Sequence, residues 1–303
     1  MEIWPLDWSH GRAKVYATGA ALHALAFDIG GRGFAPLAEA PWQTDYITAP
    51  DPAMPRHLQL LGGEWPCVPF GTTRHDPAHH GFGTDDDWRL LARGADWLRL
   101  TIDYPEASPV RRLVRELRGV PGKPRIDISL RIDVRDDCIL PVGLHPIFRL
   151  SDDLRLEAPG FEYGRSFPRI FEPGRSVLPA NAAVEHDGRI DDFGNLFETP
   201  AKGREELLQL FHCDGAMTLH YRSEAAKAHL RWDSAALPHC LLWVSNHGRD
   251  AAPWNGRFRG LGVEPVNSYF DINDAGPDTG AFGLTLRRDR PKDIRYSLSA
   301  EAA

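Results

Sequence analysis

The chain has 303 residues, of which 42% are hydrophobic and 25% charged, a composition typical of a globular protein rather than of a disordered or fibrous one. Its formal net charge of −7 disfavours binding to nucleic acid or to an anionic membrane surface. No apolar run approaches the roughly 20 residues that span a bilayer, and the first residues lack the features of a signal peptide, so we expect a cytoplasmic protein without nucleic-acid or membrane partners.

The predicted elements are mainly short strands, separated by clusters of Gly, Pro and Asp that are typical of turns. The segment 111–118 is compatible with a helix or a strand, and we favour a strand because Pro109 and Gly119 bracket it closely. One stretch, 204–211, predicts a helix of about two turns. The predicted strands, in chain order, cover residues 97–104, 111–118, 125–135, 217–221, 228–232, 240–244 and 283–286.

The clearest strand signal is segment 125–135, in which apolar and polar residues alternate. This alternation describes a strand with one buried and one solvated face, which is typical of antiparallel sheets. Many such strands, with no linker, repeat or low-complexity segment, predict an all-β fold: a large antiparallel β-sandwich that forms one domain over residues 1–303. The apolar positions of the segment are Ile126, Ile128, Leu130, Ile132 and Val134.

The cysteines and histidines predict neither a disulfide framework nor a metal site. The cysteines at 67, 138, 213 and 240 are far apart and form no CxxC pair, so we expect reduced and mostly buried thiols. Among the 13 histidines, His75 and His79 are the one pair with i, i+4 spacing, and none shows the Cys/His spacing of a zinc site. We therefore expect no bound metal.

Three polar motifs in this β-rich sequence are candidates for an acid–base site. Imidazole and carboxylate are the usual proton donor and acceptor, because modest environmental shifts bring both pKa values near neutrality. Taken singly, each motif is also compatible with a structural residue, such as a core histidine or a solvent-facing carboxylate. The motifs are His79-His80-Gly81-Phe82, Gly143-Leu144-His145-Pro146-Ile147-Phe148 and Gly262-Val263-Glu264-Pro265.

The orientation of these side chains follows from strand geometry. On a strand, Glu264 points to the face opposite Val263, and burial there would raise its pKa toward the range of a general base. Two adjacent histidines point to opposite faces of an extended chain, so we expect only one of His79 and His80 to reach the pocket, and we choose His80 because Gly81 permits close approach of a ligand.

Trp243 and Asn246 are candidates for a sugar-binding site. A sugar has apolar C–H faces and many hydroxyl groups, which suit an aromatic ring and an amide. Because the chain contains nine tryptophans, Trp243 is equally compatible with the core.

Together and in this order, the motifs resemble those of the aldose 1-epimerase, or galactose mutarotase-like, family. His80-Gly81 resembles the first histidine motif, His145-Pro146-Ile147-Phe148 the second, and segment 262–265 the one that carries the family's glutamate. Two further stretches are similar to motifs of the branch that contains the hexose-6-phosphate mutarotases. They are Gly62-Gly63-Glu64-Trp65-Pro66 and the later Pro69-Phe70-Gly71.

The resemblance implies a galactose mutarotase-like supersandwich that binds a monosaccharide on a concave sheet face and needs no cofactor. It implies aldose 1-epimerase activity, which interconverts the α and β anomers of a sugar through its open-chain form. In that mechanism Glu264 takes the proton of the anomeric hydroxyl, His145 protonates the ring oxygen, and His80 helps to hold the sugar. The sequence does not distinguish a monomer from a homodimer.

The chain departs from the hexose-6-phosphate branch at two arginines, whose positions hold Leu61 and Thr84. The loss of two phosphate-binding cations argues against a 6-phosphosugar. Arg74, or Arg257 and Arg259, are candidates to replace them or to bind another anionic group, as in a sugar acid or a sulfosugar.

Two other function classes fit the same sequence. A sugar-binding or sensing protein would use the fold without turnover, although binding alone does not need a matched acid and base. A lyase or hydrolase of uronic-acid sugars is the second class. Hydrolysis would need two carboxylates beside the bond, and Asp271 is the candidate for the second. An epimerase of hexose 6-phosphates or acidic sugars is also left open.

Overall fold

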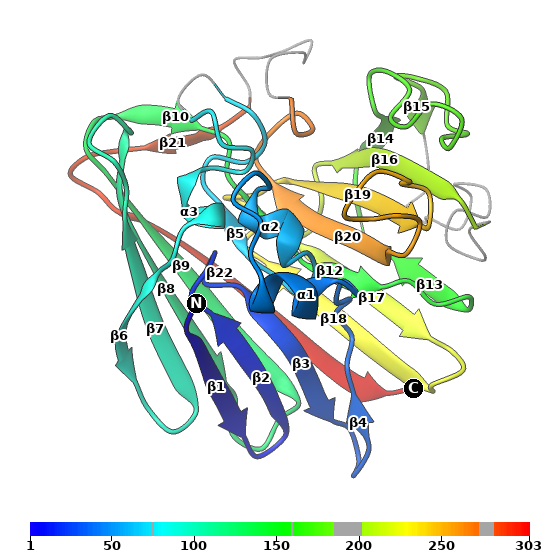
Figure 1. Ribbon diagram of the computed structural model, residues 1–303, viewed down its shortest axis with the longest axis horizontal. Coiled ribbons are helices and arrows are strands. Elements are labelled where there is room, and N and C mark those ends of the chain that lie inside the picture. The colour runs from blue at the N-terminus through cyan, green and yellow to red at the C-terminus, as the bar shows by residue number, and fades with distance from the viewer. Residues whose placement is uncertain (74–75, 159, 185–201, 273–281) are drawn as a thin grey trace.

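The computed structural model describes residues 1–73, 76–158, 160–184, 202–272 and 282–303. Antiparallel strands make up most of the regular structure in these ranges (Figure 1). The predicted antiparallel sandwich is therefore confirmed, and it contains two large sheets that we call the supporting sheet and the site sheet.

The supporting sheet has eight strands and contains most of the strands predicted from the sequence. Segments 97–104, 111–118 and 125–135 form three neighbouring long strands, and segments 217–221 and 228–232 form two more. Their order in the sheet is β13 (Leu154–Glu157), β17 (Ala216–Tyr221), β18 (Ala226–Trp232), β22 (Lys292–Ala302), β9 (Arg125–Val134), β8 (Val110–Gly119), β7 (Trp97–Asp103) and β6 (Arg89–Arg93).

The site sheet also has eight strands, and it brings together segments that are far apart in the sequence. Along its main path lie β15 (Ala183–Val184), β14 (Tyr163–Ser166), β16 (Arg204–Phe211), β19 (His239–Asn246), β20 (Arg259–Val266), β11 (Gly143–Leu144) and β5 (Pro66–Cys67). The eighth strand, β12 (Ile147–Arg149), also pairs with β20.

Smaller elements complete the described fold. A four-stranded sheet contains β1 (Ile3–Trp8), β2 (Gly11–Tyr16), β3 (Leu22–Asp28) and β4 (Gly33–Phe34), and β10 (Cys138–Leu140) pairs with β21 (Leu284–Leu286). Three short helices, α1 (Gln43–Thr48), α2 (Arg56–Gln59) and α3 (Phe82–Asp85), lie near β5 and β20 (Figure 1). None of the helices in the described ranges has the length and apolar character to cross a bilayer.

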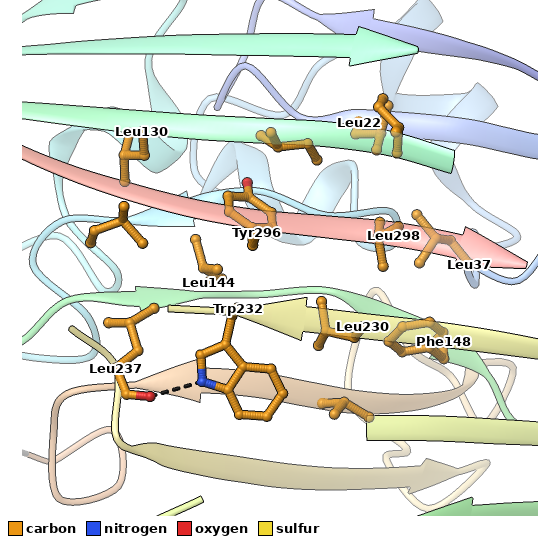
Figure 2. Packing of buried hydrophobic residues seen from close by; sticks show 14 of the residues in the cluster. Leu22, Leu37, Leu130, Leu144, Phe148, Leu230, Trp232, Leu237, Tyr296 and Leu298 are labelled. Carbon is orange, nitrogen blue, oxygen red and sulfur yellow. Dashed lines mark hydrogen bonds between the residues drawn. The ribbon is translucent and has the colours of Figure 1, made fainter. Parts of the chain in front are cut away.

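The main hydrophobic core joins side chains of the supporting sheet, the site sheet and the four-stranded sheet. Figure 2 shows part of this packing, in which Leu144, Leu230 and Tyr296 come from different strands and the Trp232 indole donates to the carbonyl of Leu237. Cys213 and Cys240 belong to this core, and all four cysteines of the chain are unpaired, as expected.

The site sheet is buried on both faces, and this explains one wrong prediction. Segment 204–211 is strand β16, not a helix. Leu208 and Leu210 enter the main core, whereas Leu207 and Phe211 pack in a second cluster on the other face. A strand with apolar residues on both faces has no clear alternation, so its pattern can be mistaken for that of a helix.

A fully buried ion pair lies between the sheets and predicts a large effect on stability. Arg115 on β8 pairs with Glu64, and Tyr296 donates to Glu64 at 2.8 Å. Removing one partner leaves the other charge buried, so Arg115→Met is expected to lower the free energy of unfolding by about 3–5 kcal/mol. Arg112, which forms an exposed pair on the same strand, is the control: Arg112→Met should cost less than about 1 kcal/mol. Equal losses in urea unfolding would contradict this account of the buried pair.

Candidate active site

A pocket of about 280 Å³ lies on the face of the site sheet that points away from the main core. Small-molecule sites begin at about 300 Å³, so the pocket suits one small ligand rather than an oligomer. Its apolar walls include Trp65, Phe171, Trp243 and Trp254. Its titratable lining residues are His57, His79, His80, His145, Arg249, Glu264 and Asp271.

Glu264 enters the pocket from β20, with its side chain only 1% exposed. As predicted, it lies on the face opposite Val263, which is in the main core. Gly262 makes room for it, because a Cβ at 262 would collide with Glu264 Oε1. Burial, and secondly the charge of Asp271, raise the pKa of Glu264 well above its usual value. Burial therefore favours the protonated form of this carboxyl.

His145 lies directly beside Glu264. It follows β11, and its backbone N–H donates to the carbonyl of Trp65 at 2.9 Å. Its ring stacks on the Trp65 ring with centroids 4.3 Å apart, and its Nε2 is 3.6 Å from Glu264 Oε1. Burial first, and the charge of His57 next, lower the pKa of His145 to about 3. Burial thus favours a neutral imidazole next to a protonated carboxyl.

Both adjacent histidines line the pocket, so the expectation that only one would reach it is wrong. The reason is the backbone: His80 has φ 67°, in the left-handed region, so the chain turns here and alternation does not apply. The two rings lie 3.9 Å apart. His80 Nδ1 accepts from the N–H of Gly71 at 3.1 Å, so the neutral ring has its proton on Nε2. Burial lowers the pKa of His80 well below its usual value and that of His79 to about 4.

His57 is a fourth imidazole at the pocket, which the sequence analysis missed. It lies on α2, and its Nδ1 is 2.8 Å from Asp85 Oδ1 at the end of α3. Burial raises the pKa of Asp85, but the hydrogen bonds and charge of His57, together with a backbone hydrogen bond from Arg56, outweigh it and lower the pKa. No motif marks His57, because its partner lies 28 residues away and the contact depends on the packing of α2 against α3.

Trp243 lines the pocket, but Asn246 does not. Both belong to β19, and residues three apart on a strand face opposite sides of the sheet. Trp243 stacks on Phe258 at 5.7 Å and donates to buried Glu205 at 3.2 Å, so its ring is held in place beside His145. The predicted sugar-binding amide is therefore not at the pocket wall.

The arginines are arranged differently from the prediction. Arg74 lies outside the described residues, and Arg257 and Arg259 do not line the pocket. Arg257 lies over the Trp42 ring, and Arg259 pairs with Asp152. Among the described residues, Arg249 is the arginine that lines the pocket. It follows strand β19, which carries Trp243, and it was not among the candidates from the sequence.

Several buried polar atoms of the pocket have no hydrogen-bond partner among the described residues. Such atoms are rare in folded proteins unless a ligand or water satisfies them. At the pocket walls they are unsatisfied hydrogen-bonding groups, which suit polar rather than purely apolar ligands. The atoms are Trp65 Nε1, His145 Nδ1, Arg249 Nε, Trp254 Nε1 and Asp271 Oδ1. Within the described ranges, no three His, Cys, Asp or Glu side chains are grouped to hold a metal ion.

Comparison with known proteins identifies the fold. The chain aligns over 100% of its length with a candidate aldose 1-epimerase from Escherichia coli K12, with TM-score 0.72, 15% identity and 99% of that chain covered. It aligns over 99% with a galactose mutarotase-like protein from Lactobacillus casei, with TM-score 0.66, 14% identity and 100% covered. An aldose epimerase homologue from C. elegans gives TM-score 0.66 at 13% identity, covering 100% of this chain and 99% of that one.

These matches show that the chain has the galactose mutarotase-like fold, as the motifs predict. At such low identity they do not establish an activity, and they do not single out the hexose-6-phosphate branch. No family model matches the sequence, and no curated protein matches it.

Proposed function

We propose that this chain, which has the galactose mutarotase-like fold, is an aldose 1-epimerase that interconverts the α and β anomers of a monosaccharide. The observation that carries the proposal is the placement of His145 Nε2 3.6 Å from Glu264 Oε1 inside a pocket of single-sugar size. Ring opening needs one proton acceptor and one proton donor within reach of the same small molecule. Structural likeness to proteins named as aldose epimerases or mutarotases supports the proposal.

In this reaction Glu264 takes the proton of the anomeric hydroxyl, and C1 and its oxygen form the aldehyde double bond. The bond between C1 and the ring oxygen breaks, and the ring oxygen takes its electron pair and a proton from His145. Rotation about the C1–C2 bond and closure by the reverse steps give the other anomer. His80 donates from Nε2 to an oxygen of the sugar, and the rings of Trp65 and Trp243 contact its apolar faces.

The proton count of the pair suits this cycle. Ring opening begins with imidazolium and carboxylate and ends with neutral imidazole and carboxylic acid, so the pair holds one proton throughout. Burial favours the neutral form of each group, as their shifted pKa values show. Before the reaction the single proton therefore rests on Glu264, it moves to His145 for ring opening to begin, and Glu264 regains a proton as the open-chain sugar forms.

The shifted pKa values predict the pH profile of kcat/KM. Two ordinary groups would acquire a second proton below about pH 4.3, the usual pKa of a glutamate. Here the second proton must protonate His145, whose pKa is about 3, and the raised pKa of Glu264 moves loss of the remaining proton to higher pH. We expect the acid limb near pH 3, measured where circular dichroism shows a folded protein. An acid limb at about pH 4.3 or above would contradict this assignment.

Anomer exchange measured by saturation-transfer NMR tests the function directly. With a panel of hexoses, pentoses and uronates, the exchange rate of at least one sugar should rise in proportion to protein concentration. A sugar that binds without faster exchange would instead identify a binding protein, the principal alternative. We include in this proposal the expected monosaccharide substrate, the cytoplasmic location and a monomeric or dimeric state.

Asp271 favours a glycoside hydrolase as the second candidate, because it lines the same pocket as Glu264. Two carboxylates beside a bond are the usual requirement for glycoside hydrolysis. A pocket of about 280 Å³ is small for the two units that such a bond joins. Release of nitrophenol from nitrophenyl glycosides would favour the hydrolase, whereas the epimerase should release none.

A further inference from the structure

Arg249 is a cation held at the pocket wall by aromatic rings. Its guanidinium carbon lies 5.2 Å from the ring centroid of Phe171, 5.3 Å from that of Trp243 and 5.1 Å from that of Trp254. Cation–π contacts of this kind, made with three rings at once, limit the positions that the guanidinium can adopt. The side chain is 26% exposed, so it is partly withdrawn from water.

The buried Nε of this guanidinium has no hydrogen-bond partner among the described residues. It forms two ion pairs instead, with carboxylate oxygens of Glu205 at 3.5 Å and Glu172 at 3.9 Å. Both carboxylates are recorded against Nε rather than against a terminal amino group. Two parallel N–H groups of an arginine match the two oxygens of a planar anion.

The surrounding acids limit the charge that Arg249 can bind. Glu205 is fully buried and is already bonded to Trp243 and Ser245, and Asp271 lines the same pocket. Of the Lys and Arg residues that the structure describes, Arg249 is the one in the pocket lining. The carboxyl groups around Arg249 oppose any added negative charge, so a phosphate monoester, with close to two charges, is repelled more strongly than a ligand with one.

We propose that Arg249 binds a singly charged carboxylate or sulfonate on the sugar, so that the substrate is a uronate or a sulfonated aldose. This inference rests on the proposed function and narrows its substrate class. Neutral hexoses offer the guanidinium no charge-assisted hydrogen bond, and sugar phosphates carry more negative charge than this wall of the pocket, with Glu205 and Glu172 beside Arg249, can accept.

The test compares sugars that differ only at C6. D-Glucose, D-glucuronate, 6-deoxy-6-sulfo-D-glucose and D-glucose 6-phosphate are assayed for anomer exchange, and the neutral, carboxylate and phosphate forms are repeated in the galacto series. For the parent protein, kcat/KM for the carboxylate or the sulfonate should exceed that for the hexose and the phosphate by about tenfold or more, since a charge-assisted hydrogen bond contributes at least that factor. The carboxylate and sulfonate arms identify which anion is preferred.

Arg249→Gln should lower the ratio of anionic to neutral kcat/KM by about tenfold or more, mainly through KM. Arg257→Gln is the matched control, because Arg257 also lies over a tryptophan ring but outside the pocket lining, and this variant should keep the parent's ratio. A parent that prefers neither monoanion in either series, or an Arg249→Gln variant with an unchanged ratio, would overturn the inference.

The design separates this inference from the proposed function. If the parent accelerates exchange of hexoses and monoanionic sugars equally, the result supports the epimerase proposal and contradicts the proposal that Arg249 binds an anionic group of the sugar. If the parent accelerates no sugar, titration calorimetry of the same sugars still tests Arg249. Tighter binding of the uronate or sulfonate than of the hexose, lost in Arg249→Gln, would support the inference, and equal binding would overturn it.

Discussion

Glu264→Gln is expected to lower kcat for anomer exchange by about 10²–10⁴-fold, because glutamine keeps the shape of the side chain but cannot accept the anomeric proton. The carboxyl is 1% exposed and lies 3.6 Å from His145, so a neutral amide of similar volume should be accommodated without loss of the fold. KM should change little, because the proton transfer is realised in the transition state. Saturation-transfer NMR at fixed protein concentration measures the loss.

The matched control for this prediction is Glu206→Gln. Glu206 is also 1% exposed, but it lies on β16 outside the pocket lining, where it accepts from the backbone N–H of Val177. The Glu206→Gln variant should therefore keep the parent's kcat, even if its melting temperature is lower. If Glu264→Gln retained kcat within threefold of the parent, Glu264 would be removed from the mechanism.

His145→Asn should produce a loss of similar size, about 10²–10⁴-fold in kcat, because the ring oxygen then lacks its proton donor. His239→Asn is the control: His239 is likewise buried, with its pKa lowered to about 4, but it lies outside the pocket lining. A parent-like rate in His145→Asn would exclude this histidine as the acid.

The double variant adds a sharper test of the pair. If His145 and Glu264 act as one unit, the loss of either disables the other, and the double variant should be about as slow as the slower single variant. Losses that multiply instead would indicate two independent contributions.

The supporting sheet shows how far local pattern predicts this fold. Strands β7 and β9 each have a face in the main core, so their alternation was visible in the sequence, whereas β8 was predicted as a strand because Pro109 and Gly119 bracket it. Strand β16 is covered on both faces, and its pattern therefore lost the period of two that identifies a strand.

The candidate site shows the same division. His145, Glu264, His80 and Trp243 were chosen from their local sequence, and the structure places all four at one pocket. The prediction that Asn246 lies in the pocket was wrong, because strand geometry puts its side chain on the face opposite Trp243. Arg249 could have been suspected from its place just after a strand that carries a candidate residue, since loops at strand ends often carry binding residues.

The amino-acid sequence by itself determined the all-β class, most strands of the supporting sheet and the two residues proposed as the acid–base pair, because each leaves a signal within a few neighbouring residues. Only the tertiary structure decided that His57, His79 and Arg249 share the pocket with that pair. Their convergence depends on a left-handed turn at His80, on the packing of α2 against α3 and on the aromatic rings around Arg249. These are contacts between distant segments, and no local pattern of residues encodes them.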